Sequence, residues 1–199
     1  MTSGTRSADR ARRAVAVALL LGLTAGTVRA AAPFDLGALM TELSAIKAGK
    51  ARFVERKTLS VLDRPLESTG ELACAAPDRF TRRTSTPRAE SVEVVGDQLT
   101  FTSGGKTRTA SLSNVPEAAG IIDALRGTLT GDQARLERVF TVKLSGTREQ
   151  WWIDLVPRDA RLSATVLSIR ISGAAARIRT VDVFGPDNDR TTTTLEPVQ

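Results

Sequence analysis

Residues 90–102 read ESVEVVGDQLTFT, and this stretch decides the fold. Apolar and polar side chains alternate on both sides of Gly96-Asp97, which is the pattern of two half-buried strands. Because Gly and Asp tolerate a positive φ angle, this dipeptide is typical of the tight turn in a β-hairpin. The stretch therefore predicts two adjacent antiparallel strands, one over 90–95 and one over 98–102.

The same alternation recurs over most of the chain, and short turn-forming segments interrupt it. These segments are rich in Pro, Gly and Asp, and they are too short for the crossover connections that parallel strands need. The sequence therefore predicts a mainly β (α+β) protein built on an antiparallel meander of about eleven strands. We expect them over residues 51–62, 66–75, 79–85, 90–95, 98–102, 107–112, 140–145, 149–156, 164–172, 176–184 and 190–196.

Three segments have the periodicity of a helix instead. Residues 36–46 place their apolar side chains on one stripe, with Asp35 suited to the N-cap and Gly49 to the stop. A second helix is expected over 116–125, with Pro at its first turn, and a third from Gly131-Asp132 to Val139. Since no segment has the composition of an interdomain linker, we expect one domain over residues 31–199.

Alternation along the predicted strands gives the sheet one apolar face. Three short helices offer few apolar side chains to cover so large a sheet, so we expect an apolar cavity between sheet and helices. A sheet that packs its own interior completely fits the same alternation. The apolar face is predicted to carry Leu99 and Phe101, Phe140, Val142 and Leu144, Trp151, Ile153 and Leu155, and Leu167, Ile169 and Ile171.

The candidate ligand-binding residues are apolar side chains of this face and of the helix stripes. Ordinary core packing is the alternative for each of them. Neighbouring residues of a strand point to opposite faces, so Trp151 is expected to face inward and Trp152 outward. Cys74 alternates in phase with Leu72, which favours a buried, inert thiol. The candidates are Met40, Phe53, Leu72, Phe80, Leu99, Phe101, Ile121, Leu125, Phe140, Val142, Trp151, Ile153, Leu167 and Ile169.

Composition excludes several classes of chemistry. The chain has no His, which excludes Ser-His-Asp and Cys-His catalysis and imidazole-bound zinc, and its single Cys excludes an internal disulfide. The net charge of +6 comes mostly from residues 1–30, whose balance of +4 leaves +2 for the rest. A hydrolase that pairs a lysine with a serine is an open alternative without a recognisable motif. We expect no enzyme, no cofactor, no metal and no nucleic-acid partner.

Residues 1–30 have the three parts of a secretory signal. Arg12-Arg13 precedes an apolar run over 14–24, and small residues follow up to Ala30. The run is shorter than the roughly 20 residues that a membrane-spanning helix needs. We therefore expect cleavage after Ala30 and an exported, soluble, monomeric protein of the periplasm.

Several short motifs follow one another in a characteristic order: 51–57 (ARFVERK), 66–72 (LESTGEL), 77–80 (PDRF), 92–97 (VEVVGD), 152–157 (WIDLVP) and 181–185 (VDVFG). In this order the chain resembles the periplasmic outer-membrane lipoprotein carrier family (LolA-like). The resemblance implies an unclosed, strongly curved antiparallel half-barrel whose helices form a lid over an apolar cavity. It also implies a carrier of lipoprotein or lipid acyl chains, loaded by an inner-membrane release or export complex and unloaded to an outer-membrane acceptor.

The chain departs from the family pattern at two positions. Family members place an Arg directly before the Pro that matches Pro77, where it helps to hold the lid closed, and this chain has Ala76. Glu55 replaces the usual Gln. Two other functions therefore stay open, both on the same expected fold. One is a carrier of another lipid, such as an aryl-polyene or acyl-linked product, and the other is a lipid-sensing regulatory module that binds a signalling protein.

Overall fold

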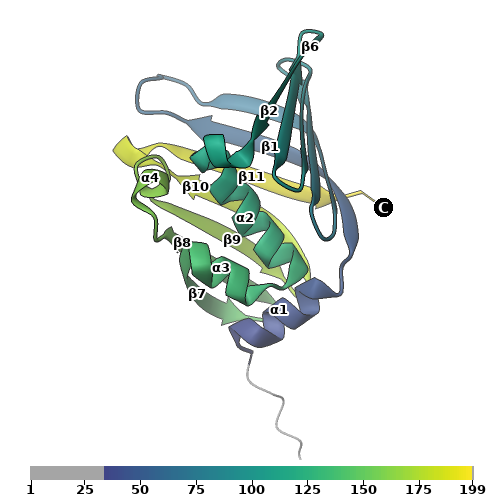
Figure 1. Ribbon diagram of the computed structural model, residues 1–199. Coiled ribbons are helices and arrows are strands. Elements are labelled where there is room, and N and C mark those ends of the chain that lie inside the picture. The colour runs from purple at the N-terminus through teal and green to yellow at the C-terminus, as the bar shows by residue number, and fades with distance from the viewer. Residues whose placement is uncertain (1–33, 199) are drawn as a thin grey trace, which may run out of the picture. The chain divides into compact units, whose positions relative to one another are not determined.

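The computed structural model describes residues 34–198 (Figure 1), so the predicted signal peptide lies outside the described residues. The elements are α1 (Leu36–Ser44), β1 (Ala48–Thr58), β2 (Leu66–Ala75), β3 (Arg79–Thr86), β4 (Glu90–Val95), β5 (Gln98–Ser103), β6 (Lys106–Ser111), η1 (Leu112–Asn114), α2 (Pro116–Thr130), α3 (Gln133–Val139), β7 (Phe140–Thr147), β8 (Gln150–Pro157), α4 (Ala160–Ser163), β9 (Ser168–Ala174), β10 (Arg177–Phe184), η2 (Pro186–Asn188) and β11 (Arg190–Pro197).

All eleven strands form one antiparallel sheet, as predicted. Its order is β6-β5-β4-β3-β2-β1-β11-β10-β9-β8-β7, so β6 and β7 are the two edges and the sheet is not closed. The first and last strands of the chain pair with each other, from Ala51 opposite Pro197 to Thr58 opposite Arg190. This long-range pairing joins two meanders, β1–β6 and β7–β11, into one continuous surface.

The helices between and before the meanders lie on one face of the sheet, which we call the inner face. Figure 1 shows α1, α2 and α3 lying across the part formed by β7–β10. The predicted N-cap of α1 is present, because the Asp35 carboxylate accepts a hydrogen bond from the backbone N–H of Ala38 at 2.8 Å. Asp132 caps α3 in the same way by accepting from the N–H of Arg135. The predicted stop at Gly49 is wrong, since α1 ends at Ser44 and Gly49 lies in β1. Among residues 34–198, no helix is long and apolar enough to cross a bilayer.

Helix α2 is longer than the sequence predicted, and it ends at Thr130 rather than at residue 125. The apolar positions continue through Leu129, which extends the stripe by one turn. The helix then ends at Gly131, whose φ of 66° lies in the left-handed region that favours glycine.

The predicted strand over 164–172 is wrong in its first part. Residues 160–163 form the short helix α4, which Asp159 caps by accepting hydrogen bonds from two backbone N–H groups. After α4 the chain places Val166 in the core, and β9 begins only at Ser168. Leu167 precedes this strand and its side chain is 51% exposed, so it is not part of the buried core to which Ile169 and Ile171 belong.

The core consists of two clusters that lie on either side of α2. The large cluster packs α1, α2, α3 and α4 against β7–β10, and the small cluster packs α2 and η1 against β3–β5. Trp151 is fully buried in the large cluster, and its indole N–H donates to the carbonyl of Ala175 at 2.8 Å. The expected inward orientation of Trp151, Ile153 and Leu155 is therefore confirmed.

The inner face is apolar beneath the helices and mixed beyond them, where Phe53 lies beside polar side chains. Cross-strand neighbours share a face, and one row across the sheet runs from polar to apolar side chains. The expectation of one uniformly dry face is therefore wrong, because the part formed by β1, β2 and β11 carries polar groups. The row consists of Ser68, Glu55, Thr193, Val181, Ile171 and Ile153.

Candidate functional site

Helix α2 divides the interior of the molecule. Ala124, Ile121 and Leu125 belong to the large cluster on the β7–β10 side. Ile122, together with Ala118 and Ala119, belongs to the small cluster on the β3–β5 side. The same helix therefore covers both meanders, and any space for a ligand between sheet and helices lies alongside it.

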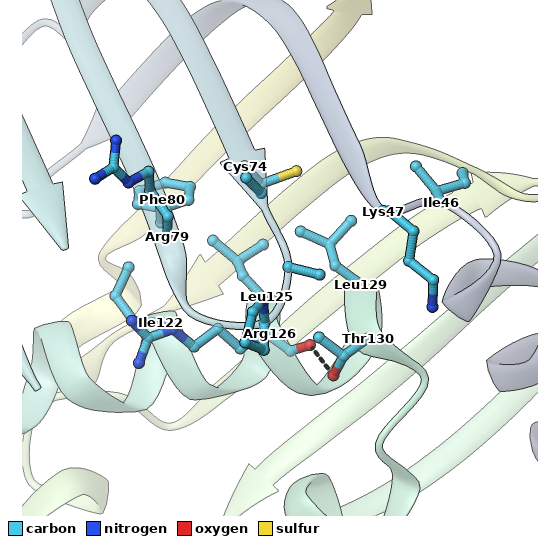
Figure 2. A pocket seen from close by; sticks show the side chains of 13 residues that line it. Ile46, Lys47, Cys74, Arg79, Phe80, Ile122, Leu125, Arg126, Leu129 and Thr130 are labelled. Carbon is cyan, nitrogen blue, oxygen red and sulfur yellow. Dashed lines mark hydrogen bonds between the residues drawn. The ribbon is translucent and has the colours of Figure 1, made fainter. Parts of the chain in front are cut away.

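A small pocket lies on the side of α2 that faces the β2–β3 turn. Figure 2 shows Leu125 and Leu129 extending from the helix towards the strand that carries Cys74. The volume is about 20 Å³, which holds about one water molecule. This pocket is much smaller than the apolar cavity that the sequence led us to expect. The lining residues are Ile46, Lys47, Cys74, Ala75, Ala76, Pro77, Arg79, Phe80, Ile122, Leu125, Arg126, Leu129 and Thr130.

The sequence-predicted ligand-binding residues fall into separate groups. Beneath the helices, the large cluster gathers Met40, Ile121, Leu125, Phe140, Val142, Trp151, Ile153 and Ile169. The small cluster gathers Phe80 and Leu99. Phe53 is buried on β1, while Leu72 and Phe101 are half-buried on β2 and β5. Phe80 and Leu125 are the two candidates that line the pocket, and exposed Leu167 lies outside all of these groups.

Arg126 is the functional candidate that the sequence reasoning missed. It lies on α2 and is only 8% exposed, and its guanidinium donates to the backbone carbonyl of Asp78 at 2.5 Å. Its Nε is buried without a hydrogen-bond partner. Burial, followed by repulsion from Arg135, lowers the pKa of Arg126. The sequence does carry a signal for this residue, because Arg126 follows Ile122 by four positions and so shares the otherwise apolar stripe of α2.

Arg126 joins the helix layer to the β2–β3 turn. Asp78, which accepts its hydrogen bond, follows Ala76, where the resemblance leads one to expect an arginine, by two residues. The resemblance led us to expect an arginine of the β2–β3 turn to contact the lid, and this chain has Ala76 at that position. The structure supplies a contact between the same two elements from the helix side.

Cys74 faces the same pocket from β2. Burial raises the pKa of its thiol, although a contact with the carbonyl of Gly49 opposes this shift. The thiol is therefore protonated at neutral pH and a poor nucleophile, in agreement with the interpretation as an inert residue. Because it is the single cysteine of the chain, it is also a specific chemical probe of the pocket.

A polar cluster occupies the inner face beyond the helices. Arg82 donates two hydrogen bonds to the Glu55 carboxylate, at 2.7 and 2.8 Å, and its guanidinium lies 4.5 Å from the centre of the Phe53 ring. Burial, the largest influence, raises the pKa of Glu55, but the hydrogen bonds and charge of Arg82, with hydrogen bonds from Thr193 and Ser68, lower it overall. Glu55 is therefore an ionised partner of Arg82.

Burial raises the pKa of the Cys74 thiol, which disfavours the reactive thiolate. Residues 34–198 contain no group of three His, Cys, Asp or Glu residues placed to hold a metal. The site instead offers apolar surface beneath a helix that one buried arginine connects to the opposite meander. Such an arrangement is suited to binding an apolar molecule if α2 moves.

An open antiparallel sheet with a helix layer on its inner face defines a class of half-barrel proteins. The family model for outer membrane lipoprotein carrier protein LolA-like matches residues 28–197, which is most of the chain. The chain belongs to this LolA-like family. A search of curated proteins found no match.

Solved structures with similar folds share little sequence with this chain. A LolA superfamily protein from Nitrosomonas europaea is 7% identical, covering 82% of this chain and 92% of its own, with a TM-score of 0.44. A DUF1329 family protein from Desulfovibrio piger is 8% identical, covering 81% and 89%, with a TM-score of 0.48. Lipoprotein LppX from Mycobacterium tuberculosis is 12% identical, covering 81% and 97%, with a TM-score of 0.37.

Proposed function

We propose that this protein is a periplasmic carrier that binds the acyl chains of a lipoprotein or another lipid between its sheet and its helix layer. The carrier takes its cargo from an inner-membrane release or export complex and delivers it to an outer-membrane acceptor. Membership of the LolA-like family supports this proposal. The carrier needs no catalytic group, because shielding an acyl chain from water is a matter of apolar surface.

The observation that carries the proposal is the uneven attachment of the helix layer to the two meanders. On the β7–β10 side, fourteen buried residues form one continuous cluster with the helices. On the β3–β5 side, three buried residues do so, and the pocket lies on this side of α2. We call the contact between α2 and the β2–β5 surface the seam, and it is the place where the layer separates with least loss of buried apolar area.

One side-chain hydrogen bond, from Arg126 to Asp78, joins α2 to the β1–β6 meander in the part of the chain that the structure describes. A hydrogen bond from a charged donor stabilises by about 1.5–3 kcal/mol. Burying an acyl chain gains about 0.8 kcal/mol per CH₂ group, so a chain of about ten groups gains roughly 8 kcal/mol. An entering acyl chain therefore has enough binding free energy to replace this hydrogen bond and part of the small cluster.

Titration with a fluorescent long-chain fatty acid and with a triacylated lipopeptide tests the proposal. Both probes should bind the purified protein, and Leu129→Gln, which places an amide at the seam, should weaken binding about tenfold or more. Val54→Gln is the matched control, because Val54 is exposed on the opposite face of β1 and should leave binding unchanged. Failure of both probes to bind the folded protein would contradict the proposal.

A further inference from the structure

The exposed apolar side chains of the structure are concentrated at one end of the sheet. Eight large hydrophobic residues are exposed in the described chain, and five of them lie where β1 ends, β2 and β9 begin and β8 ends. These five are Val61, Leu62, Leu66, Val156 and Leu167. All three exposed leucines are at this end, so the concentration is more than the ordinary scatter of apolar surface.

The connection between β1 and β2 is the most exposed part of this end, and we call residues 59–66 the β1–β2 tip. Val61 is 84% exposed and Leu62 is 42% exposed. Figure 1 shows the tip at the end of the β1–β2 hairpin, on the same side of the molecule as α4 and the end of β10. Neither side chain contributes to the two core clusters.

The backbone of the tip is held in place. The N–H of Leu62 donates to the carbonyl of Leu59 at 3.0 Å, which closes a turn. The N–H of Ser60 donates to the carboxylate of Asp189 at 2.7 Å, which anchors the tip to the start of β11. The fold therefore fixes a conformation that exposes Val61 and Leu62 to solvent.

The remaining exposed residues of this end extend along it rather than forming one flat patch. Leu167 lies at the start of β9, where its N–H donates to the carbonyl of Phe184. In the sheet, β11 and β10 separate β9 from β1. Strands lie about 4.8 Å apart, so Leu167 and the end of β1 are separated by roughly 14 Å. A fluid surface accommodates separate projections of this kind better than a folded partner with fixed shape.

The charges near the tip are almost balanced. Arg56, Lys57 and Arg64 are exposed, and so are Asp63 and Glu67. Basic residues therefore outnumber acidic ones by one over 56–67, too few to drive binding by charge. Apolar contact is the attraction that remains.

From this arrangement we infer that the β1–β2 tip inserts into the interfacial region of a lipid bilayer. Val61 and Leu62 enter first, and Leu66 and Leu167 follow as the end of the sheet approaches the surface. This inference concerns contact with a membrane rather than binding of a cargo. The vesicle experiment below contains no cargo acceptor, so it can fail while the proposed carrier function holds.

Flotation with vesicles of phosphatidylcholine and phosphatidylethanolamine tests the inference on the mature protein. The wild type should float with the vesicles, and Val61→Asp and Leu62→Asp should each reduce the bound fraction about tenfold. Val95→Asp is the matched control, because Val95 is 39% exposed at the opposite end of the sheet and should leave flotation unchanged. Replacing part of the lipid with phosphatidylglycerol, or raising the salt concentration, should change binding by less than about threefold.

Four results would overturn the inference. The first is a wild-type protein that does not float, and the second is a Val95→Asp protein that loses binding as strongly as Leu62→Asp. The third is binding that requires phosphatidylglycerol and disappears in salt, and the fourth is a wild-type dimer that Leu62→Asp dissociates. The last result would assign the tip to a second copy of the chain. Because Val61 and Leu62 are exposed, both variants should keep the unfolding temperature of the wild type, which a thermal melt checks.

Discussion

Replacing Arg126 with alanine should open the seam without unfolding the protein. The change removes the hydrogen bond from α2 to the Asp78 carbonyl, which contributes about 1.5–3 kcal/mol as a bond from a charged donor. The Nε of Arg126 is buried without a hydrogen-bond partner, which destabilises the closed form and offsets part of this contribution. We therefore use the lower end of the range. A loss of about 1.5 kcal/mol raises the open population about tenfold.

The thiol of Cys74 reports this opening, because it is the only thiol in the chain and it faces the pocket. The closed pocket holds about one water molecule, so a maleimide reagent reaches the thiol mainly from the open form. Opening also removes the burial that raises the pKa of Cys74, which makes the thiol more reactive. Arg126→Ala should therefore increase the alkylation rate about tenfold under native conditions.

Two further variants separate the hydrogen bond from other effects. Arg135→Ala removes an ion pair to Asp123 within the helix layer and should leave the alkylation rate unchanged. Arg126→Met restores apolar packing without the hydrogen bond and should stay faster than the wild type. The reasoning is refuted if Arg126→Ala keeps the wild-type rate while remaining folded, or if Arg135→Ala accelerates alkylation equally.

Three other variants test the packing and charges around the site. Gly173→Ala places a methyl group against the Trp151 ring and the Arg177 carbonyl, so it should lower the free energy of unfolding by about 1–3 kcal/mol in urea; unchanged stability would contradict the packing described. Gly120→Ala places a methyl group 2.6 Å from Leu162 Cδ2 and should lower the thermal midpoint, whereas Gly49→Ala, whose methyl group meets only Cys74 Sγ at 3.8 Å, should lower it less. Glu55 has a lowered pKa, so its stabilisation is complete above the ordinary value of 4.5 and is lost as pH falls through the folded value. Glu55→Gln should be less stable at pH 7 and should lose less stability on acidification than the wild type; equal losses in acid melts would exclude this role.

The sequence was most informative where local turn chemistry and strand alternation agree. The hairpin around Gly96 has β4 at the predicted residues and β5 one residue longer, because a left-handed glycine fixes the turn and the alternation fixes the register. The burial of Trp151, Ile153 and Leu155 follows from the same alternation. The order of the strands was predictable only as far as the meander, since the pairing of β1 with β11 depends on residues far apart in sequence.

The errors of prediction have physical causes that a single sequence hides. Leu167 continues the apolar alternation of β9, but the cap at Asp159 starts a short helix that changes the direction of the chain before it. Glu55 and Arg82 share the inner face with Phe53, because each satisfies the other there. Arg126 looks like an ordinary exposed helix residue until the β2–β3 turn is seen to accept its hydrogen bond. How much of the inner face the helices fill depends on side-chain packing and not on alternation.

Mass spectrometry of the protein purified from its native host, under conditions that preserve bound lipid, tests the carrier proposal most directly. We predict a population whose mass exceeds that of the polypeptide by one acyl-bearing molecule, and the Leu129→Gln protein should carry less of it. The proposal is contradicted if the wild type is always recovered at the mass of the bare chain and if neither it nor the Arg126→Ala protein takes up an acylated molecule.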